Sequence, residues 1–405
     1  MQQILHLCIV DRDRAAALAT WYGPKWLLPV ISCSERARAA PAAARWASEV
    51  GVAWDVAGQW LGRLAAEGTD WLIAGTAQCP PVIDSKLQWT PLTDLSSSLA
   101  VIDYQGWAIA QCLENGPLPL VPGPFGNLTW LNDVRRWIRA SAGALVGAIT
   151  PYRVSPYEVV LGVDTHSGRV YFKGLDERRA LEARLTMTLA AIVPGAFAQT
   201  LAVESKSDGS VWWLTCECPG TTTLDGGLVA RPLARLQRRL MASGPLIGEL
   251  RPLDLDEAVR WASTFVAGSA CVPAIAEQTE RVKRAAVPES WIPMDLHPTN
   301  VLVDGAGQVR FIDLDDSYLG PAPLAMALFA QRCRKTSHYR PYEESWSPAL
   351  RHVDWPAFEA VAALLDARHG WLRIERYTRS GEVYGALDVA ASRIRQRLEF
   401  AFSPR

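Results

Sequence analysis

The chain has 405 residues, of which 49% are apolar and 20% charged, and its formal net charge is −1. This length exceeds that of one ordinary hydrophobic core, so two or three domains are expected. A charge so close to zero gives no electrostatic case for a nucleic acid or an anionic membrane surface as the main partner.

The cysteines and the N-terminus indicate the cellular compartment. None of the eight cysteines forms a Cys-x-x-Cys pair, and Cys216 and Cys218 share one face of an expected strand. Reduced cysteines are therefore expected, rather than zinc ligands or disulfides. The first residues lack a basic region before an apolar core, and no window is apolar for long enough to span a bilayer. We expect a cytoplasmic protein with no membrane partner.

Residues 1–115 alternate short apolar runs with one helix, which predicts a small α/β domain. The helix is expected over residues 35–50, because this stretch is rich in alanine and Gly51 is a typical stop. The expected strands are Ile4–Val10, Ala17–Tyr22, Trp26–Ile31, Val56–Leu64 and Asp70–Thr76, with two closing pieces at Gln88–Leu95 and Ala100–Cys112.

A proline-rich stretch divides the chain. Pro117, Pro119, Pro122 and Pro124 exclude both a helix and a central strand. We expect an extended linker over residues 116–128 and a second domain over residues 129–405.

The second domain begins with strands and continues with helices. Its first part, about residues 129–218, is expected to contain helices at Trp130–Ala142 and Asp176–Ile192 and strands at Tyr157–Val163, Arg169–Lys173, Gln199–Ser205 and Val211–Cys218. Its second part, about residues 219–405, is expected to be mainly helical, with helices at Leu233–Met241 and Leu255–Phe265, a helical tail and an aromatic loop at His338–Pro348.

Five aspartates and an asparagine gather within Ile292–Asp316, beside two short apolar strands. The sequence Asp304-Gly-Ala-Gly307 favours a tight reversal, which brings Asn300 and Asp313 together at the open end of a hairpin. Prolines on either side keep the loop around Asp295 non-helical. Three oxygen-bearing side chains then converge, as Mg²⁺ requires when water and phosphate oxygens fill its other positions.

The alternative is a surface hairpin whose polar residues only form turns. It explains Asp304, because aspartate commonly starts such turns. It explains Asp295, Asn300 and Asp313 poorly, because apolar strands flank them and burying a lone carboxylate is unfavourable.

The run Met294-Asp-Leu-His-Pro-Thr-Asn300, followed by an apolar hairpin and Asp313, resembles the catalytic loop of the aminoglycoside phosphotransferase family. The resemblance implies an α+β, bilobal protein-kinase-like fold with a small β-rich lobe and a larger helical lobe. It also implies ATP and Mg²⁺ as cofactors, Asp295 as catalytic base or hydroxyl-orienting group, and Asn300 and Asp313 as metal ligands. In the same loop Asp315 would support a second metal or the loop itself, and His297 is expected to bond the loop backbone.

The resemblance extends to the strand-rich part. Lys173 ends an alternating strand and resembles the phosphate-binding lysine of kinases. Its implied partner is Glu182 on the next helix, with Glu177 as the alternative. The passage after the last strand resembles the hinge that presents backbone groups to adenine, which implies nucleotide contacts from Glu217 and Cys218.

The chain departs from the family pattern in three places. No Gly-x-Gly-x-x-Gly loop precedes Lys173, Pro293 stands where relatives have a histidine, and the sequence after Gly320-Pro321 lacks an ordering aspartate. The loss of the histidine leaves a nucleotide-binding pseudokinase as an alternative.

Residues 1–115 resemble, more weakly, the scaffold of nudix hydrolases. Those enzymes bind metal through several glutamates on one helix, and only Glu49 stands at such a position here. A degenerate nudix-like domain, used for packing or substrate recognition, is the resulting interpretation.

Together these features predict an ATP- and Mg²⁺-dependent phosphotransferase that acts on a hydroxyl group of a small molecule. The alternatives are a serine/threonine protein kinase and a pseudokinase that serves as an interaction protein. Acceptor contacts are expected from the helical tail and the loop at His338–Pro348.

Overall fold

The computed structural model describes residues 2–11, 16–22, 25–34, 39–65, 68–77, 87–91, 123–125, 130–147, 149–155, 157–177, 179–243, 250–267, 269, 271–314, 316–333, 338–347, 350, 352–379 and 387–402. The described chain folds into two compact units. The first comprises Met1–Ala180, Thr200–Glu217 and Tyr377–Val383, and the second comprises Leu181–Gln199, Cys218–Arg376 and Tyr384–Arg405.

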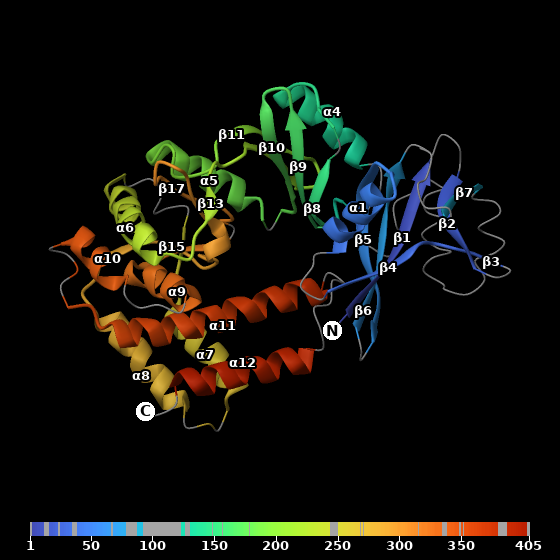
Figure 1. Cartoon of the computed structure of the whole chain (residues 1–405). Coiled ribbons are helices and arrows are strands. Elements are labelled where there is room, and N and C mark those ends of the chain that lie inside the picture. Colours follow the sequence, from blue (N-terminus) through green and yellow to red (C-terminus); the bar gives the residue numbers. More distant parts are fainter. Residues whose placement is uncertain are drawn as a thin grey trace. The chain divides into compact units, whose positions relative to one another are not determined.

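The first unit opens with a mixed β-sheet and one flanking helix (Figure 1). The elements are β1 (Gln2–Asp11), β2 (Ala16–Tyr22), β3 (Lys25–Leu27), β4 (Val30–Ser34), α1 (Ala39–Glu49), β5 (Trp54–Ala65), β6 (Gly68–Ala77) and β7 (Leu87–Pro91). β1 pairs in parallel with β6 and antiparallel with β2 and β4. All residues from Leu5 to Ile9 are buried, so both faces of β1 are covered.

The predicted strand Trp26–Ile31 is wrong in one respect, because it is divided into β3 and β4. Pro29 lies at the break, and a proline has no N–H to donate to a sheet ladder. The predicted helix is confirmed as α1, which is followed by Gly51 in the left-handed region (φ 84°).

A second sheet in the same unit forms the β-rich lobe. Its elements are α4 (Trp130–Ala142), β8 (Thr150–Val154), β9 (Glu158–Thr165), β10 (Gly168–Leu175), β11 (Thr200–Ser205) and β12 (Val211–Cys216), with the strand order β11-β12-β10-β9-β8. All neighbours are antiparallel. The predicted alternation in β10 is confirmed, because Val170 and Phe172 are buried while Tyr171 and Lys173 are partly exposed.

The two sheets of the first unit share one hydrophobic cluster. Ala43, Val52 and Val56 of the front region belong to the same buried cluster as Val159 and Leu161 of β9. The predicted linker 116–128 and the predicted element Ala100–Cys112 lie outside the described residues, apart from 123–125. The domain boundaries at 115 and 128 therefore stay predictions.

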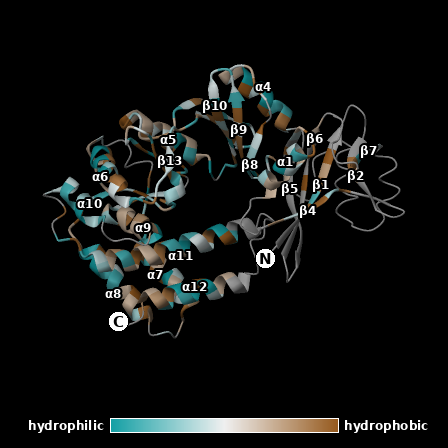
Figure 2. Cartoon of the chain, in the orientation of Figure 1, coloured by the Kyte–Doolittle hydropathy of each residue, from teal (hydrophilic) through white to brown (hydrophobic). Residues whose placement is uncertain are grey.

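The second unit is mainly helical. Its helices are α5 (Leu181–Ile192), α6 (Gly226–Ser243), α7 (Leu255–Phe265), α8 (Cys271–Arg284), η2 (Pro298–Asn300), α9 (Pro323–Cys333), α10 (Tyr339–Trp346), α11 (Trp355–Arg379) and α12 (Leu387–Phe402). Its strands are β13 (Thr221–Thr222), β14 (Arg251–Pro252), β15 (Glu289–Pro293), β16 (Val301–Val303), β17 (Val309–Phe311) and β18 (Ser317–Pro321). Most of α9 is hydrophobic (Figure 2), and every residue from Pro323 to Ala330 is buried.

The helix predicted over Asp176–Ile192 begins later, at Leu181. The residues before it form turns, in which the N–H of Arg179 donates to the carbonyl of Asp176 at 3.0 Å. Arg179 is buried and forms an ion pair with Glu158 of β9. This pairing holds residues 176–180 against the sheet instead of in the helix.

The loop predicted at His338–Pro348 is wrong, because α10 occupies most of it. Pro341 lies in the first turn of α10, where its missing N–H has no intrahelical role. Tyr342 and Trp346 are buried, and Tyr339 stacks on Trp355 with 3.8 Å between ring centroids. These aromatic side chains belong to the core of the unit.

No helix within the described residues is both long and apolar enough to cross a membrane. The described cysteines form no disulfides with one another: Cys8, Cys33, Cys216, Cys218, Cys271 and Cys333.

Candidate functional site

Asn300 and Asp313 lie at the open end of the hairpin formed by β16 and β17. The register pairs Val301 with Phe311 and Val303 with Val309, and the N–H of Ile312 donates to the carbonyl of Asn300 at 3.0 Å. Asn300 and the residue after Ile312, Asp313, are therefore neighbours across the hairpin, as predicted.

Asp304 forms the turn of this hairpin. Its Oδ1 accepts hydrogen bonds from the backbone N–H groups of Gln308 at 2.9 Å and Ala306 at 3.0 Å. These bonds, with an ion pair to Arg310, hold the pKa of Asp304 below its ordinary value. Asp304 is therefore a turn residue and does not belong to the residues at the open end of the hairpin.

The loop around Asp295 is held by its own polar groups. Asn300 Nδ2 donates to the backbone carbonyl of Asp295 at 2.9 Å and to its Oδ2 at 3.4 Å. His297 caps η2, because its Nδ1 accepts from the backbone N–H of Thr299 at 3.3 Å. The expected role of His297 in bonding the loop backbone is confirmed, and burial lowers its pKa.

Asp313 adopts a strained backbone conformation. Its φ is 65°, in the left-handed region that residues other than glycine rarely adopt. Such conformations gather at functional sites, where the surrounding structure enforces them. The constraint sets where the Asp313 carboxylate can lie relative to Asn300. Asp315, the other candidate for a supporting role, lies outside the described residues.

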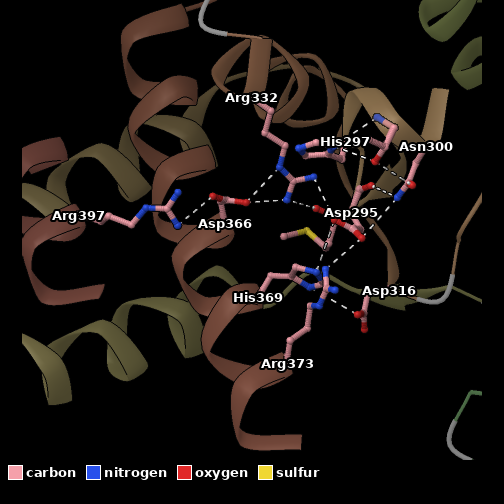
Figure 3. A network of polar contacts seen from close by, with 11 residues as sticks. Asp295, His297, Asn300, Asp316, Arg332, Asp366, His369, Arg373 and Arg397 are labelled. Atoms are coloured by element: carbon pink, nitrogen blue, oxygen red, sulfur yellow. Dashed lines mark hydrogen bonds and ion pairs between the residues drawn. The ribbon is translucent and has the colours of Figure 1, made fainter. Parts of the chain in front are cut away.

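Asp295 also lies among basic side chains of two later helices (Figure 3). Arg332 Nη1, from α9, is 3.5 Å from Asp295 Oδ1. Arg373 Nη1, from α11, donates to Asp295 Oδ2 at 3.3 Å. The Asp295 side chain is 17% exposed, so these ion pairs are only partly screened by solvent.

Asp366 and the Met294 carbonyl hold the Arg332 guanidinium in place. Its Nε and Nη2 donate to Asp366 Oδ1 at 3.1 and 2.6 Å, and Nη2 also donates to the Met294 carbonyl at 3.0 Å. The side chain is only 9% exposed. Its third nitrogen, Nη1, is buried and has no hydrogen-bond partner within the described part of the chain. The guanidinium is therefore fixed, with Nη1 directed at Asp295.

His369 of α11 lies between Asp295 and Asp316. Its Nδ1 is 3.5 Å from Asp316 Oδ2, and its Nε2 is 3.9 Å from Asp295 Oδ1. Burial lowers the pKa of His369, an effect that Asp316 and Asp295 partly oppose. The imidazole is therefore uncharged near neutral pH, and its buried Nε2 has no hydrogen-bond partner among the residues that the structure describes.

Sequence reasoning missed Arg332, Asp366, His369 and Arg373. A weak signal exists for each of them. Arg332 is the charged residue at the end of the apolar helix α9. Asp366, His369 and Arg373 follow one another at intervals of three and four residues, which places them on one face of α11.

The chemistry of the donor set fits Mg²⁺. Asn300 and Asp313, neighbours across the hairpin, offer an amide and a carboxylate oxygen, and Mg²⁺ is commonly bound by one or two carboxylates with water and phosphate oxygens. Among the described residues, no group of three or more His, Cys, Asp or Glu side chains is placed to hold a metal ion.

Lys173 lies in the first unit, on the central strand β10. It pairs with Trp213 of β12 and Val160 of β9. Its ammonium group lies 5.6 Å from the centre of the Trp213 ring, a distance at which an aromatic face attracts a cation.

The two candidate glutamates differ in burial. Glu182 lies in the first turn of α5, in the second unit, and is 2% exposed. Glu177 belongs to the first unit and is exposed. A buried carboxylate needs a partner, so this contrast favours Glu182 as the residue with a specific role.

Glu217 and Cys218 lie where the chain passes from one unit to the other. The N–H of Glu217 donates to the carbonyl of Arg169 at 3.1 Å, and its carboxylate accepts from the Tyr171 hydroxyl at 3.3 Å. Cys218 is partly buried. The predicted lobe boundary, between 218 and 219, is one residue from this passage.

Residues 157–336 match the model of the phosphotransferase enzyme family, APH. The GDP complex of wild-type aminoglycoside 2'-phosphotransferase-IIIa is 12% identical to the chain, with a TM-score of 0.51 over 68% of this chain and 98% of that one. The GDP and kanamycin complex of APH(2")-IIia is 12% identical, with a TM-score of 0.50 over 66% and 98%. Choline kinase from Streptococcus pneumoniae is 11% identical, with a TM-score of 0.48 over 67% and 99%. No curated protein matches the chain.

At these identities the structural likeness establishes the fold. About two thirds of the chain has the α+β kinase-like fold that was predicted. The front region lies outside the family match, and its nudix-like interpretation has no support from these comparisons.

Proposed function

We propose that the chain transfers the γ-phosphate of ATP to a hydroxyl of a small molecule, with Mg²⁺, because residues 157–336 match the phosphotransferase enzyme family. The observation that carries the proposal is that Asn300 bonds the Asp295 carbonyl and lies across the hairpin from Asp313. In the reaction, the bond between the γ-phosphorus and the ADP oxygen breaks as a bond to the acceptor oxygen forms, and the hydroxyl loses its proton.

Each residue has one role in this proposal. Asp295 accepts or orients the proton of the hydroxyl. Asn300 and Asp313 would hold Mg²⁺, which neutralises phosphate charge when bound. Lys173 contacts the nucleotide phosphates and Glu182 orients Lys173.

The nucleotide base has its own proposed contacts. The backbone at Glu217 and Cys218 contacts the adenine, so the side chains there carry little specificity. The two aminoglycoside phosphotransferase structures named above hold GDP, so ATP and GTP should both be tried as donors.

The surroundings of Asp295 favour positioning over strong base catalysis. Asp295 is held by Asn300, Arg332 and Arg373. Phosphoryl transfer relies mainly on alignment and charge neutralisation, so a carboxylate fixed in this way suits the reaction.

The replacement of the family histidine by Pro293 does not leave the loop without an imidazole. Pro293 is the last residue of β15, and the N–H of Met294 donates to the Asp316 carbonyl at 2.8 Å. His369 lies beside Asp295 and Asp316 from another helix. This arrangement favours an active enzyme over a pseudokinase.

The decisive experiment measures phosphate transfer from labelled ATP across a panel of hydroxyl compounds, with Asp295→Asn as the matched variant. The wild type should transfer phosphate, and the variant should be slower by about 10²–10⁴-fold while it still binds Mg-ATP. Binding of Mg-ATP by both forms with no transfer by either would establish a pseudokinase. Labelling of proteins in place of the small compounds would establish a protein kinase.

For the front region we propose a degenerate nudix-like domain that serves packing. Its helix α1 buries five alanines, whereas Glu49 is exposed. A single carboxylate on this helix is too few for a diphosphate hydrolase. The packing role is tested with α1 variants described in the Discussion.

A further inference from the structure

Asp295, Asp316 and Asp366 each lie beside a guanidinium or an imidazole group. Asp366 contacts Arg332 at 2.6 Å and Arg397 at 3.5 Å. Asp316 faces His369, and Asp295 itself faces Arg332 and Arg373. An ammonium group on an acceptor would therefore compete with a guanidinium for Asp295 or Asp366.

One nitrogen of Arg332, Nη1, has only a long contact to an oxygen atom, 3.5 Å from Asp295 Oδ1. Among the described residues this buried nitrogen has no hydrogen-bond partner, whereas Nε and Nη2 donate to Asp366 and Met294. A buried donor without an acceptor is unfavourable, and more so when it is charged. An oxygen from a ligand beside Asp295 would complete it.

Arg373 supplies a second guanidinium that a ligand can reach. Its side chain is 42% exposed, and it contacts Asp295 through Nη1 on Oδ2, the oxygen opposite the one that faces Arg332. A guanidinium fork matches the geometry of carboxylate and phosphate groups. His369, the other nitrogen group here, is treated as uncharged, so the two arginines set the charge that a ligand meets at Asp295.

We propose that the acceptor carries an anionic group, a carboxylate or a phosphate, which binds Arg332 and Arg373 while the acceptor hydroxyl lies at Asp295. This inference rests on the proposed function, since it assigns a substrate class to the same site. A hydroxy acid and a phosphorylated alcohol meet this description, and a polycationic amine does not.

The test uses four compounds on one three-carbon frame. Glycerol is neutral, glycerate has a carboxylate, glycerol 3-phosphate has a phosphate, and 3-aminopropane-1,2-diol has an ammonium group. Their binding to the full chain is measured by calorimetry without nucleotide, and phosphate transfer is measured separately with Mg-ATP. We expect at least one anion to bind at least about tenfold more tightly than glycerol, with the amine weakest. The stronger of the two anions identifies the group as carboxylate or phosphate.

Arg373→Gln and Arg397→Gln form a matched pair of variants. Both remove one partly exposed guanidinium from the same cluster, but Arg397 contacts Asp366 and not Asp295. Arg373→Gln should weaken the binding of the anion about 10–100-fold and leave that of glycerol nearly unchanged. Arg397→Gln should change both by less than about threefold.

Two results would overturn the proposal. One is binding of glycerol or the amine at least as tightly as both anions, which includes the case in which no compound binds. The other is an anion preference that survives in Arg373→Gln.

If Arg373 instead served only the transferred phosphate, the variant would slow transfer equally to every compound without changing their binding. Calorimetry needs no turnover, so an anion preference without any phosphate transfer would refute the proposed function and retain the anion site.

Discussion

Each residue around Asp295 has its own contacts in this site. Asn300 holds the loop through the Asp295 carbonyl, while Arg332 and Arg373 face the Asp295 carboxylate. His369 is the buried titratable group that connects this cluster with Asp316. Its protonation state therefore affects both the stability of the fold and the charge around Asp295.

The lowered pKa of His369 predicts a loss of stability in acid. In the unfolded chain a histidine titrates near its ordinary pKa of about 6.5, and burial places the folded value below this. As the pH falls through this range the unfolded chain takes up the proton first, so the free energy of unfolding decreases. Above the unfolded pKa the contribution of His369 is fully present.

The measurement is chemical denaturation between about pH 7 and pH 5, the range around the ordinary pKa of histidine. His369→Asn should flatten the decrease in the free energy of unfolding. His352→Asn, a change at an exposed histidine, should leave the wild-type slope. An unchanged slope in His369→Asn would contradict the assigned protonation state.

At the scale of elements, the hairpin β16–β17 depends on a close backbone contact from β13. β13 pairs with β16, and Gly220 immediately precedes β13 with φ 125°. A Cβ on Gly220 would lie 2.8 Å from the backbone carbon and oxygen of Val303. The passage after Cys218 is thereby packed against the hairpin that carries Asn300.

Gly220→Ala should therefore destabilise the second unit by about 1–3 kcal/mol, through backbone strain and the displacement of Val303. Gly305, in the turn of the same hairpin, has open space around a built Cβ, so Gly305→Ala should change the free energy of unfolding by less than about 1 kcal/mol. Urea denaturation followed by tryptophan fluorescence compares them. Equal effects of the two substitutions would argue against the close contact.

At the scale of the whole molecule, each compact unit has its own hydrophobic cluster. The cluster of the first unit contains residues from the front sheet, from α1 and from the β-rich lobe. The β-rich lobe thus uses the front region to cover part of its apolar surface. Removing residues 1–128 would expose that surface, and large exposed apolar patches cause aggregation.

A single substitution tests the shared core without truncation. Ala43 of α1 is fully buried, and Ser48 on the same helix is exposed. Ala43→Asp buries a carboxylate without a partner and should lower the stability of the first unit by several kcal/mol, with weaker nucleotide binding. Ser48→Asp should change neither by more than about 0.5 kcal/mol.

Thermal unfolding and Mg-ATP titration of both variants provide the readouts. Normal nucleotide binding in an Ala43→Asp protein with a destabilised first unit would show that the lobe does not depend on the front region.

The parts of the fold that follow from local sequence agree best with prediction. α4 and α7 begin and end at the predicted residues, because their apolar spacing is regular. The predicted start of α5 failed because Arg179 is held by Glu158 of a distant strand. The predicted loop at His338–Pro348 is mostly a helix instead. Pro341 lies in the first turn of this helix, where a proline is tolerated.

The sequence by itself determined that Asp313 lies across the hairpin from Asn300, beside the loop of Asp295. These residues lie within one loop and one hairpin, so turn chemistry and strand alternation are enough to bring them together. Only the tertiary structure decided what surrounds Asp295. Arg332, His369 and Arg373 come from α9 and α11, and the Arg373 contact spans 78 residues. Such contacts depend on how helices pack, which no local pattern encodes, and they define the charge that the acceptor meets.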